Sequence, residues 1–114
     1  TTENAYYNFF VKQDIKIDLL HIDAGHSYED VKKDFELYSK LMNKNGIISI
    51  HDSDENFQKE LIITEDEKEY YEFFDGPPKF IKEIGQEWKQ FNFFNNGNFP
   101  SKPSSTGITL LQRA

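Results

Sequence analysis

The chain of 114 residues contains no cysteine, one methionine and one tryptophan. The lack of cysteine excludes disulfide frameworks, thiolate catalysis and cysteine-ligated zinc. No apolar run approaches the roughly 20 residues of a membrane-spanning helix, and the N-terminus lacks a signal-peptide pattern. Lysine and arginine number 13 against 20 acids, for a net charge of −7 and no basic stripe. We therefore expect no nucleic-acid or membrane partner, and a cytoplasmic setting.

The length suits one domain with its own core. The hydrophobic share of 37% is modest, but aromatic residues make up 16% of the chain. Each buried ring removes a large apolar area from water, so the aromatic share compensates. We predict a single α/β domain over residues 1–114.

A strand, a helix and a second strand form the clearest pattern. The apolar run Ile15–Ile22 reads as a buried strand, covered on both faces. Ser27 predicts a helix N-cap, and apolar residues follow at spacings of three and four. Asn43–Gly46 predicts the end of that helix, and Ile47–Ile50 a second buried strand. This order predicts a right-handed βαβ unit with parallel strands.

The rest of the chain predicts a smaller closing set of elements. Residues 54–75 are highly charged, with some helical patterning, and the helix at 79–84 follows two prolines. Trp88–Phe94 and Thr106–Gln112 predict an antiparallel strand pair, joined by a loop over 95–105. The predicted fold is a three-layer α/β fragment: a βαβ unit, a helix and a C-terminal hairpin.

All three histidines lie just after or within the two predicted parallel strands. Because the carboxyl ends of parallel strands meet at a crevice where α/β proteins bind ligands, we expect a site there. Asp23 and Asp52 end the strands and suit a hard cation such as Mg²⁺. His26 and His51 suit a general base near neutral pH, or a softer metal.

Two neighbouring polar residues have simpler interpretations. His21 lies within the first strand, where a hydrogen-bonded core histidine is the more common case. Asp54 is interpreted as a turn or cap residue.

The segments Ile17–Val31 and Leu41–Asp52 together resemble the second half of a class I S-adenosylmethionine-dependent methyltransferase. The closest likeness is to O-methyltransferases with a His-Ser-Tyr turn after one strand and His-Asp after the next. The tail, with Thr106–Leu111 as a closing strand, supports the resemblance. It implies a partial Rossmann-like sheet and a small hydroxylated methyl acceptor, such as a sugar.

The resemblance also implies roles for the polar residues. Asp23 matches a position that ligates Mg²⁺ or assists deprotonation, and Asp52 matches a second metal ligand. His51 lies beside Asp52, and His26 matches a base or an orienting group for the acceptor hydroxyl. We therefore predict Asp23, His26 and His51 as catalytic residues, and Asp23 and Asp52 as metal ligands.

One feature of that family is missing from this sequence. The glycine-rich turn that would hold the cofactor is absent, as are the strands that precede Ile17–Ile22. We expect the chain to be the C-terminal half of a methyltransferase domain that binds S-adenosylmethionine weakly or not at all when isolated, and is then inactive. The unpaired edge of Ile17–Ile22 would invite pairing with another copy or with a missing half.

Three other classes of protein are alternatives to a methyltransferase. His21, Asp23 and His51 match the two-histidine, one-carboxylate set of iron oxygenases, although those sites usually sit in all-β barrels. A metal-dependent hydrolase could use the same cluster. A non-enzymatic, acidic α/β interaction module is the third alternative.

Overall fold

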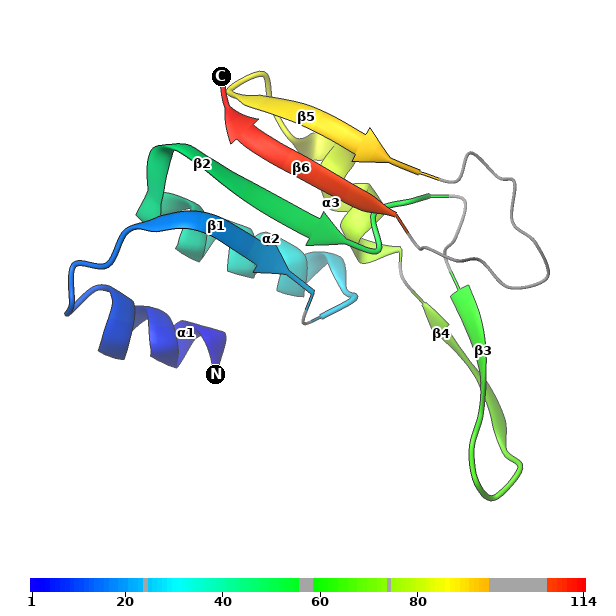
Figure 1. Cartoon of the computed structure of the whole chain (residues 1–114). Coiled ribbons are helices and arrows are strands. Elements are labelled where there is room, and N and C mark those ends of the chain that lie inside the picture. Colours follow the sequence, from blue (N-terminus) through cyan, green and yellow to red (C-terminus); the bar gives the residue numbers. More distant parts are fainter. Residues whose placement is uncertain (24, 56–58, 74, 95–106) are drawn as a thin grey trace.

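A computed structural model describes residues 1–23, 25–55, 59–73, 75–94 and 107–114 (Figure 1). The elements, in chain order, are α1 (Thr2–Ala5), the π-helical turn η1 (Tyr6–Phe10), β1 (Ile17–Ile22), α2 (Tyr28–Tyr38), the 3₁₀ turn η2 (Ser39–Leu41), β2 (Met42–His51), β3 (Lys59–Ile63), β4 (Glu69–Phe73), α3 (Gly76–Glu83), β5 (Trp88–Phe93) and β6 (Ile108–Arg113).

The main sheet has four strands in the order β1-β2-β6-β5. Strands β1 and β2 run parallel with Ile22 opposite Ile50, and α2 connects them, as the sequence predicts. Strand β6 pairs antiparallel with both β2 and β5, which confirms the closing strand pair. The result is a mixed α/β fold consistent with a partial Rossmann-like sheet. The joining loop predicted over 95–105 lies outside the described residues.

The helices pack on one face of this sheet (Figure 1). Val31 and Phe35 of α2 and Phe80 of α3 form the core with Ile48 and Ile50 of β2. The Phe35 ring lies 5.1 Å from that of Phe80, measured between centroids, so the aromatic residues supply much of the core.

The opposite face of the sheet is open among the described residues, so the expectation of three layers is wrong for this part of the chain. Leu19 of β1 is 69% exposed, and Phe91 and Phe93 of β5 are 55% and 62% exposed. By contrast, Ile22 of β1 and Leu111 of the adjacent strand β6 are buried. Successive residues of a strand point to opposite faces, and only one face here carries helices. The prediction that the first strand is buried on both sides is wrong for the same reason.

The start of α2 follows the prediction, but its end does not. The backbone N–H of Asp30 donates to Ser27 Oγ at 3.1 Å, which confirms the N-cap. Asn43–Gly46, predicted to end the helix, instead lies within β2, which begins at Met42. A side chain at Gly46 would lie 3.1 Å from the carbonyl oxygen of Ile17. The missing side chain of Gly46 therefore allows the two strands to approach closely, and the residue does not cap a helix.

The helical patterning expected over 54–75 is wrong for the residues that the structure describes there. Strands β3 and β4 form a separate antiparallel hairpin that projects from the body (Figure 1). Isoleucine and tyrosine in the two strands favour this form over a helix. Glu67, with φ of +61°, makes the turn between them.

Candidate active site

The polar residues converge at one end of the sheet because β1 and β2 are parallel. Asp23 follows β1, His51 is the last residue of β2, and Asp52 follows it. Asp52 has φ of +57°, a left-handed conformation that is uncommon outside glycine and is concentrated at functional sites. Its side chain is only 5% exposed, against 44% for Asp23.

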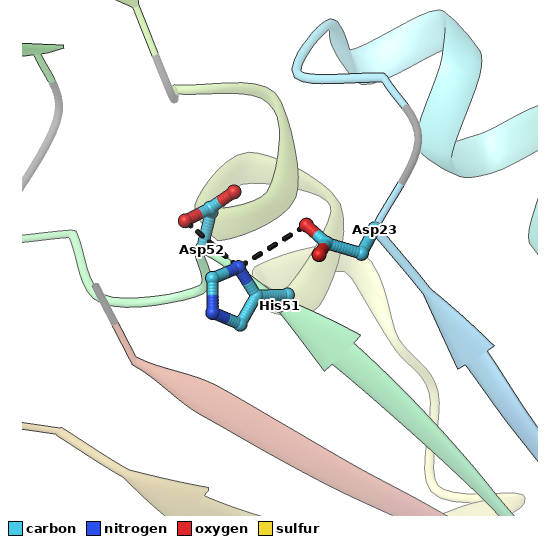
Figure 2. A group of neighbouring side chains, drawn as sticks. All are labelled: Asp23, His51 and Asp52. Carbon is cyan, nitrogen blue, oxygen red and sulfur yellow. Dashed lines mark ion pairs between the residues drawn. The ribbon is translucent and has the colours of Figure 1, made fainter. Parts of the chain in front are cut away.

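His51 lies between the two carboxylates (Figure 2). Its Nδ1 is 3.2 Å from Asp23 Oδ1 and 3.0 Å from Asp52 Oδ1. These distances qualify as ion pairs, yet the buried Nδ1 has no partner with hydrogen-bond geometry in the described residues. A hydrogen bond needs alignment as well as proximity, so these two contacts are ion pairs and not hydrogen bonds. The three ligand atoms lie within 4.8 Å of one another, a grouping that could hold a metal ion.

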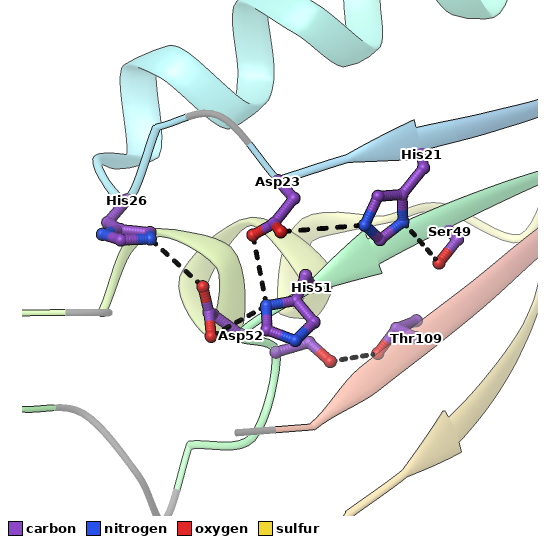
Figure 3. A network of polar contacts seen from close by, with 8 residues as sticks. His21, Asp23, His26, Ser49, His51, Asp52 and Thr109 are labelled. Carbon is purple, nitrogen blue, oxygen red and sulfur yellow. Dashed lines mark hydrogen bonds and ion pairs between the residues drawn. The ribbon is translucent and has the colours of Figure 1, made fainter. Parts of the chain in front are cut away.

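His26 contacts the other oxygen of the same carboxylate (Figure 3). Its Nε2 lies 3.2 Å from Asp52 Oδ2, and its side chain is 29% exposed. Asp52 thus joins two histidines that lie 25 positions apart in the chain. The structure brings together Asp23, His26, His51 and Asp52, the four residues that the sequence singles out for the site; their roles stay predictions.

The turn that carries His26 is fixed to α3 as well as to α2. The backbone N–H of Gly76 donates to the carbonyl oxygen of His26 at 3.2 Å. Tyr28, the first residue of α2, donates its phenol hydrogen to a carboxylate oxygen of Glu83. This hydrogen bond is the largest cause of a raised pKa for the Tyr28 phenol, because only the protonated phenol can donate to the carboxylate. Helix α3 therefore helps to hold His26 opposite Asp52.

His21 extends the polar network along β1 (Figure 3). Its Nδ1 is 3.1 Å from Ser49 Oγ, a hydrogen bond. Its Nε2 is 3.8 Å from Asp23 Oδ2, which is too far for one. The expectation of a hydrogen-bonded histidine is confirmed, but a core position is wrong, since the side chain is 50% exposed on the open face.

Three buried polar residues near the site were not predicted from the sequence. Ser53, Asp54 and Thr109 are at most 2% exposed. A side chain at Gly107 would lie 2.6 Å from the Asp54 Cβ, so the chain packs closely there. Asp54 is thus fully buried, and its interpretation as a turn or cap residue stays a prediction. A glycine directly before the last strand, Gly107, could have indicated close packing at this point. Nothing in the sequence shows, however, that it faces Asp54.

Comparisons with known proteins give two matches. Residues 1–53, slightly less than half of the chain, match a family described as a methyltransferase domain. This match supports a methyltransferase domain, and its segment contains all four site residues. An uncharacterized protein of Sinorhizobium fredii, y4gI, is 38% identical over 42 residues, which are 37% of this chain and 5% of that protein. The chain thus spans a small part of that relative's length.

No solved structure matches the chain significantly. Among the described residues, no helix is both long and apolar enough to cross a membrane.

Proposed function

We propose that this chain is the acceptor-side half of a methyltransferase domain that methylates an oxygen of a small hydroxylated molecule, with help from a divalent cation. The methyltransferase-domain match over residues 1–53 supports the reaction class. One observation carries the site: within that segment, the buried His51 Nδ1 lies between two carboxylates without a hydrogen bond.

The residues fit a divalent cation in chemistry and in spacing. Bonds of about 2.1 Å from a metal to its ligands place neighbouring ligands of an octahedral shell about 3.0 Å apart. The Nδ1 atom of His51 lies 3.2 Å and 3.0 Å from the oxygens of Asp23 and Asp52. Two carboxylates suit Mg²⁺, and an imidazole as third ligand also suits Mn²⁺. We propose His51 as a ligand beside Asp23 and Asp52.

A cation held there would act as a Lewis acid and lower the pKa of an acceptor hydroxyl. His26 would then take up the hydroxyl proton. Asp52 Oδ2 faces His26 Nε2 at 3.2 Å and favours the tautomer with the proton on that nitrogen. The partly exposed ring of His26 could then meet an acceptor hydroxyl.

The methyl donor implied by such a domain is S-adenosylmethionine. The 114 residues contain no G-x-G-x-x-G-like turn, so this chain alone does not fit that cofactor. We propose that residues beyond the printed sequence, in the same or another polypeptide, supply the cofactor-binding half.

The open face and the outer edge of β1 support this second part of the proposal. Wholly parallel sheets are covered on both faces, and β1 and β2 are the parallel pair of this mixed sheet. Here Leu19, Phe91 and Phe93 are more than half exposed on one face, and β1 is the edge strand of its sheet. A cofactor-binding half could cover the face and pair with the edge; a second copy is the alternative. Sedimentation measurements should show self-association or aggregation of the isolated chain, and a monodisperse monomer would count against an unsatisfied edge.

Metal binding tests the site directly. Titration with Mn²⁺ should broaden the NMR signals of the His51 ring before those of other residues. Asp23→Asn and Asp52→Asn should each weaken this binding at least tenfold, since each removes a charged ligand. Asp66→Asn, at the exposed hairpin turn, changes the net charge equally and should have no effect. Equal Mn²⁺ broadening in all three variants would exclude the proposed ligand set.

Product analysis separates the rival functions. With the completed domain, a methyltransferase yields a methylated product only when the methyl donor is present, whereas a metal-dependent hydrolase yields product without it. An interaction module would tolerate Asp23→Asn and Asp52→Asn without loss of activity of the full-length protein.

A further inference from the structure

A second feature lies next to the candidate metal centre, on the helix side of the sheet. A hollow of about 280 Å³ opens between α3, β5 and the loop that follows β2. Its lining includes Ser53, the residue directly after the predicted ligand Asp52. This volume is near the lower end for small-molecule pockets and suits one small ring.

Part of the lining, here called the floor, is apolar. Pro78, Ile81 and Ile84 come from α3 and the residue after it, and Phe94 follows β5. An aliphatic and aromatic floor can cover one face of a ring that carries C–H groups.

The polar residues of the lining form its wall, and two of them, Ser53 and Asn92, are hydrogen-bonded to the buried Thr109. The Thr109 hydroxyl oxygen is 2.7 Å from Asn92 Oδ1 and 2.9 Å from Ser53 Oγ. An amide oxygen only accepts, so Thr109 gives its one proton to Asn92, and Ser53 in turn donates to Thr109. Gln90 Nε2 also donates to Asn92 Oδ1, at 3.1 Å.

This network fixes what the wall offers to a ligand. With Oδ1 of Asn92 facing Thr109 and Gln90, its Nδ2 group is directed away from them as a donor. Gln90 keeps Oε1 as an acceptor. Thr109 is fully buried and anchors the Asn92 amide from the core side, while Gln90 and Asn92 themselves are exposed. Lys82 and Glu55 form an ion pair among the lining residues.

From this geometry we propose that the hollow binds a single polyhydroxylated ring, of monosaccharide size, as the methyl acceptor or part of it. A sugar ring has C–H faces for the apolar floor, and hydroxyls that can donate to Gln90 and accept from Asn92. A planar catechol has two hydroxyls and would leave most of the polar wall unpaired, which is costly. The assignment of the ring as acceptor rests on the proposed methyltransferase function; its binding does not.

Binding can be tested on the chain without cofactor or metal. NMR titration with methyl glucoside should give saturable shifts at Gln90 and Ile84, with a dissociation constant in the millimolar range expected for one sugar ring. Gln90→Leu should weaken binding at least tenfold, and Gln90→Trp should abolish it by filling the hollow. Gln90 is exposed, so neither change threatens folding. Gln86→Trp, in the exposed turn before β5, is the matched control and should leave binding unchanged.

Two results would overturn the proposal: unsaturable shifts with methyl glucoside, or tighter binding of catechol than of the glycoside. The outcome is separable from that of the metal centre. Asp23→Asn should weaken Mn²⁺ binding at least tenfold and keep glucoside binding, while Gln90→Trp should abolish glucoside binding and keep Mn²⁺ binding. If the chain fails to bind the glucoside but still binds Mn²⁺, the sugar-binding proposal is rejected and the proposed metal site is not affected.

Discussion

Substitution of Gly76 by alanine should detach the turn that carries His26. Gly76 opens α3, and its backbone N–H donates to the carbonyl oxygen of His26 at 3.2 Å. An added Cβ would lie far inside van der Waals contact of three backbone atoms, which belong to His26, Ser27 and Tyr28. Backbone atoms cannot rotate aside as a side chain can, so α3 and the turn must separate.

The size of the effect follows from three contributions. Overpacking costs about 1–3 kcal/mol, and the strained hydrogen bond about 0.5–1.5 kcal/mol. Alanine regains up to about 1 kcal/mol through its helix propensity. We therefore expect Gly76→Ala to lower the free energy of unfolding by about 0.5–4.5 kcal/mol, which is a sizeable share of the stability of a small domain.

Urea denaturation, read by Trp88 fluorescence, would measure this loss. Gly85→Ala is the control, since a Cβ there would meet only the flexible carboxylate end of Glu87, and its effect should stay within about 0.5 kcal/mol. The ring signals of His26 should also shift in the Gly76 variant, because the contact with Asp52 is disturbed. Equal stability of Gly76→Ala and the parent chain would refute this reasoning.

Three further predictions concern the core and the titrating groups. Ile48→Ala should cost about 2–5 kcal/mol and Ile47→Ala about 1 kcal/mol in urea denaturation, because Ile48 is fully buried and Ile47 faces the open side; equal losses would contradict the assignment of faces. Burial is the main cause of the raised pKa of Asp34, so its contribution to stability is complete below the unfolded pKa and declines as the pH rises through the folded one. Asp34→Asn should therefore be the more stable chain at pH 7, by less than about 1 kcal/mol, and match the parent near pH 3. Glu83→Gln should lower the pKa of the Tyr28 phenol in a ¹³C NMR titration, and an unchanged value would argue against their hydrogen bond.

The central βαβ unit could be predicted because its signals are local. Ser27 caps the helix through its own side chain, and the spacing of Val31 and Phe35 defines the buried face. The apolar runs before Asp23 and Asp52 are strands that must run parallel once a helix connects them. The convergence of the site residues follows from that topology alone.

The elements that could not be predicted depend on distant contacts. Asn43–Gly46 has the composition of a helix end, yet it lies within β2, at the register shift between the residues that pair with Ile17 and Leu19 of β1. The charged segment around β3 and β4 carries mixed patterns, and cross-strand pairs such as Ile62 with Tyr70 decide its form. Thr109, Ser53 and Asn92 meet from three separate segments, so no local pattern reveals the polar wall of the hollow.

The sequence by itself determined which residues end the two parallel strands, since strand, cap and helix signals lie within a few positions of one another. It thereby brought Asp23, His26, His51 and Asp52 to one edge of the sheet. Only the tertiary structure decided how they meet there. Asp52 adopts a left-handed backbone and contacts both His26 and His51, while His51 Nδ1 is buried between two carboxylates. Ångström-scale separations of side-chain atoms depend on packing across the whole domain, and this is why they cannot be predicted from sequence spacing.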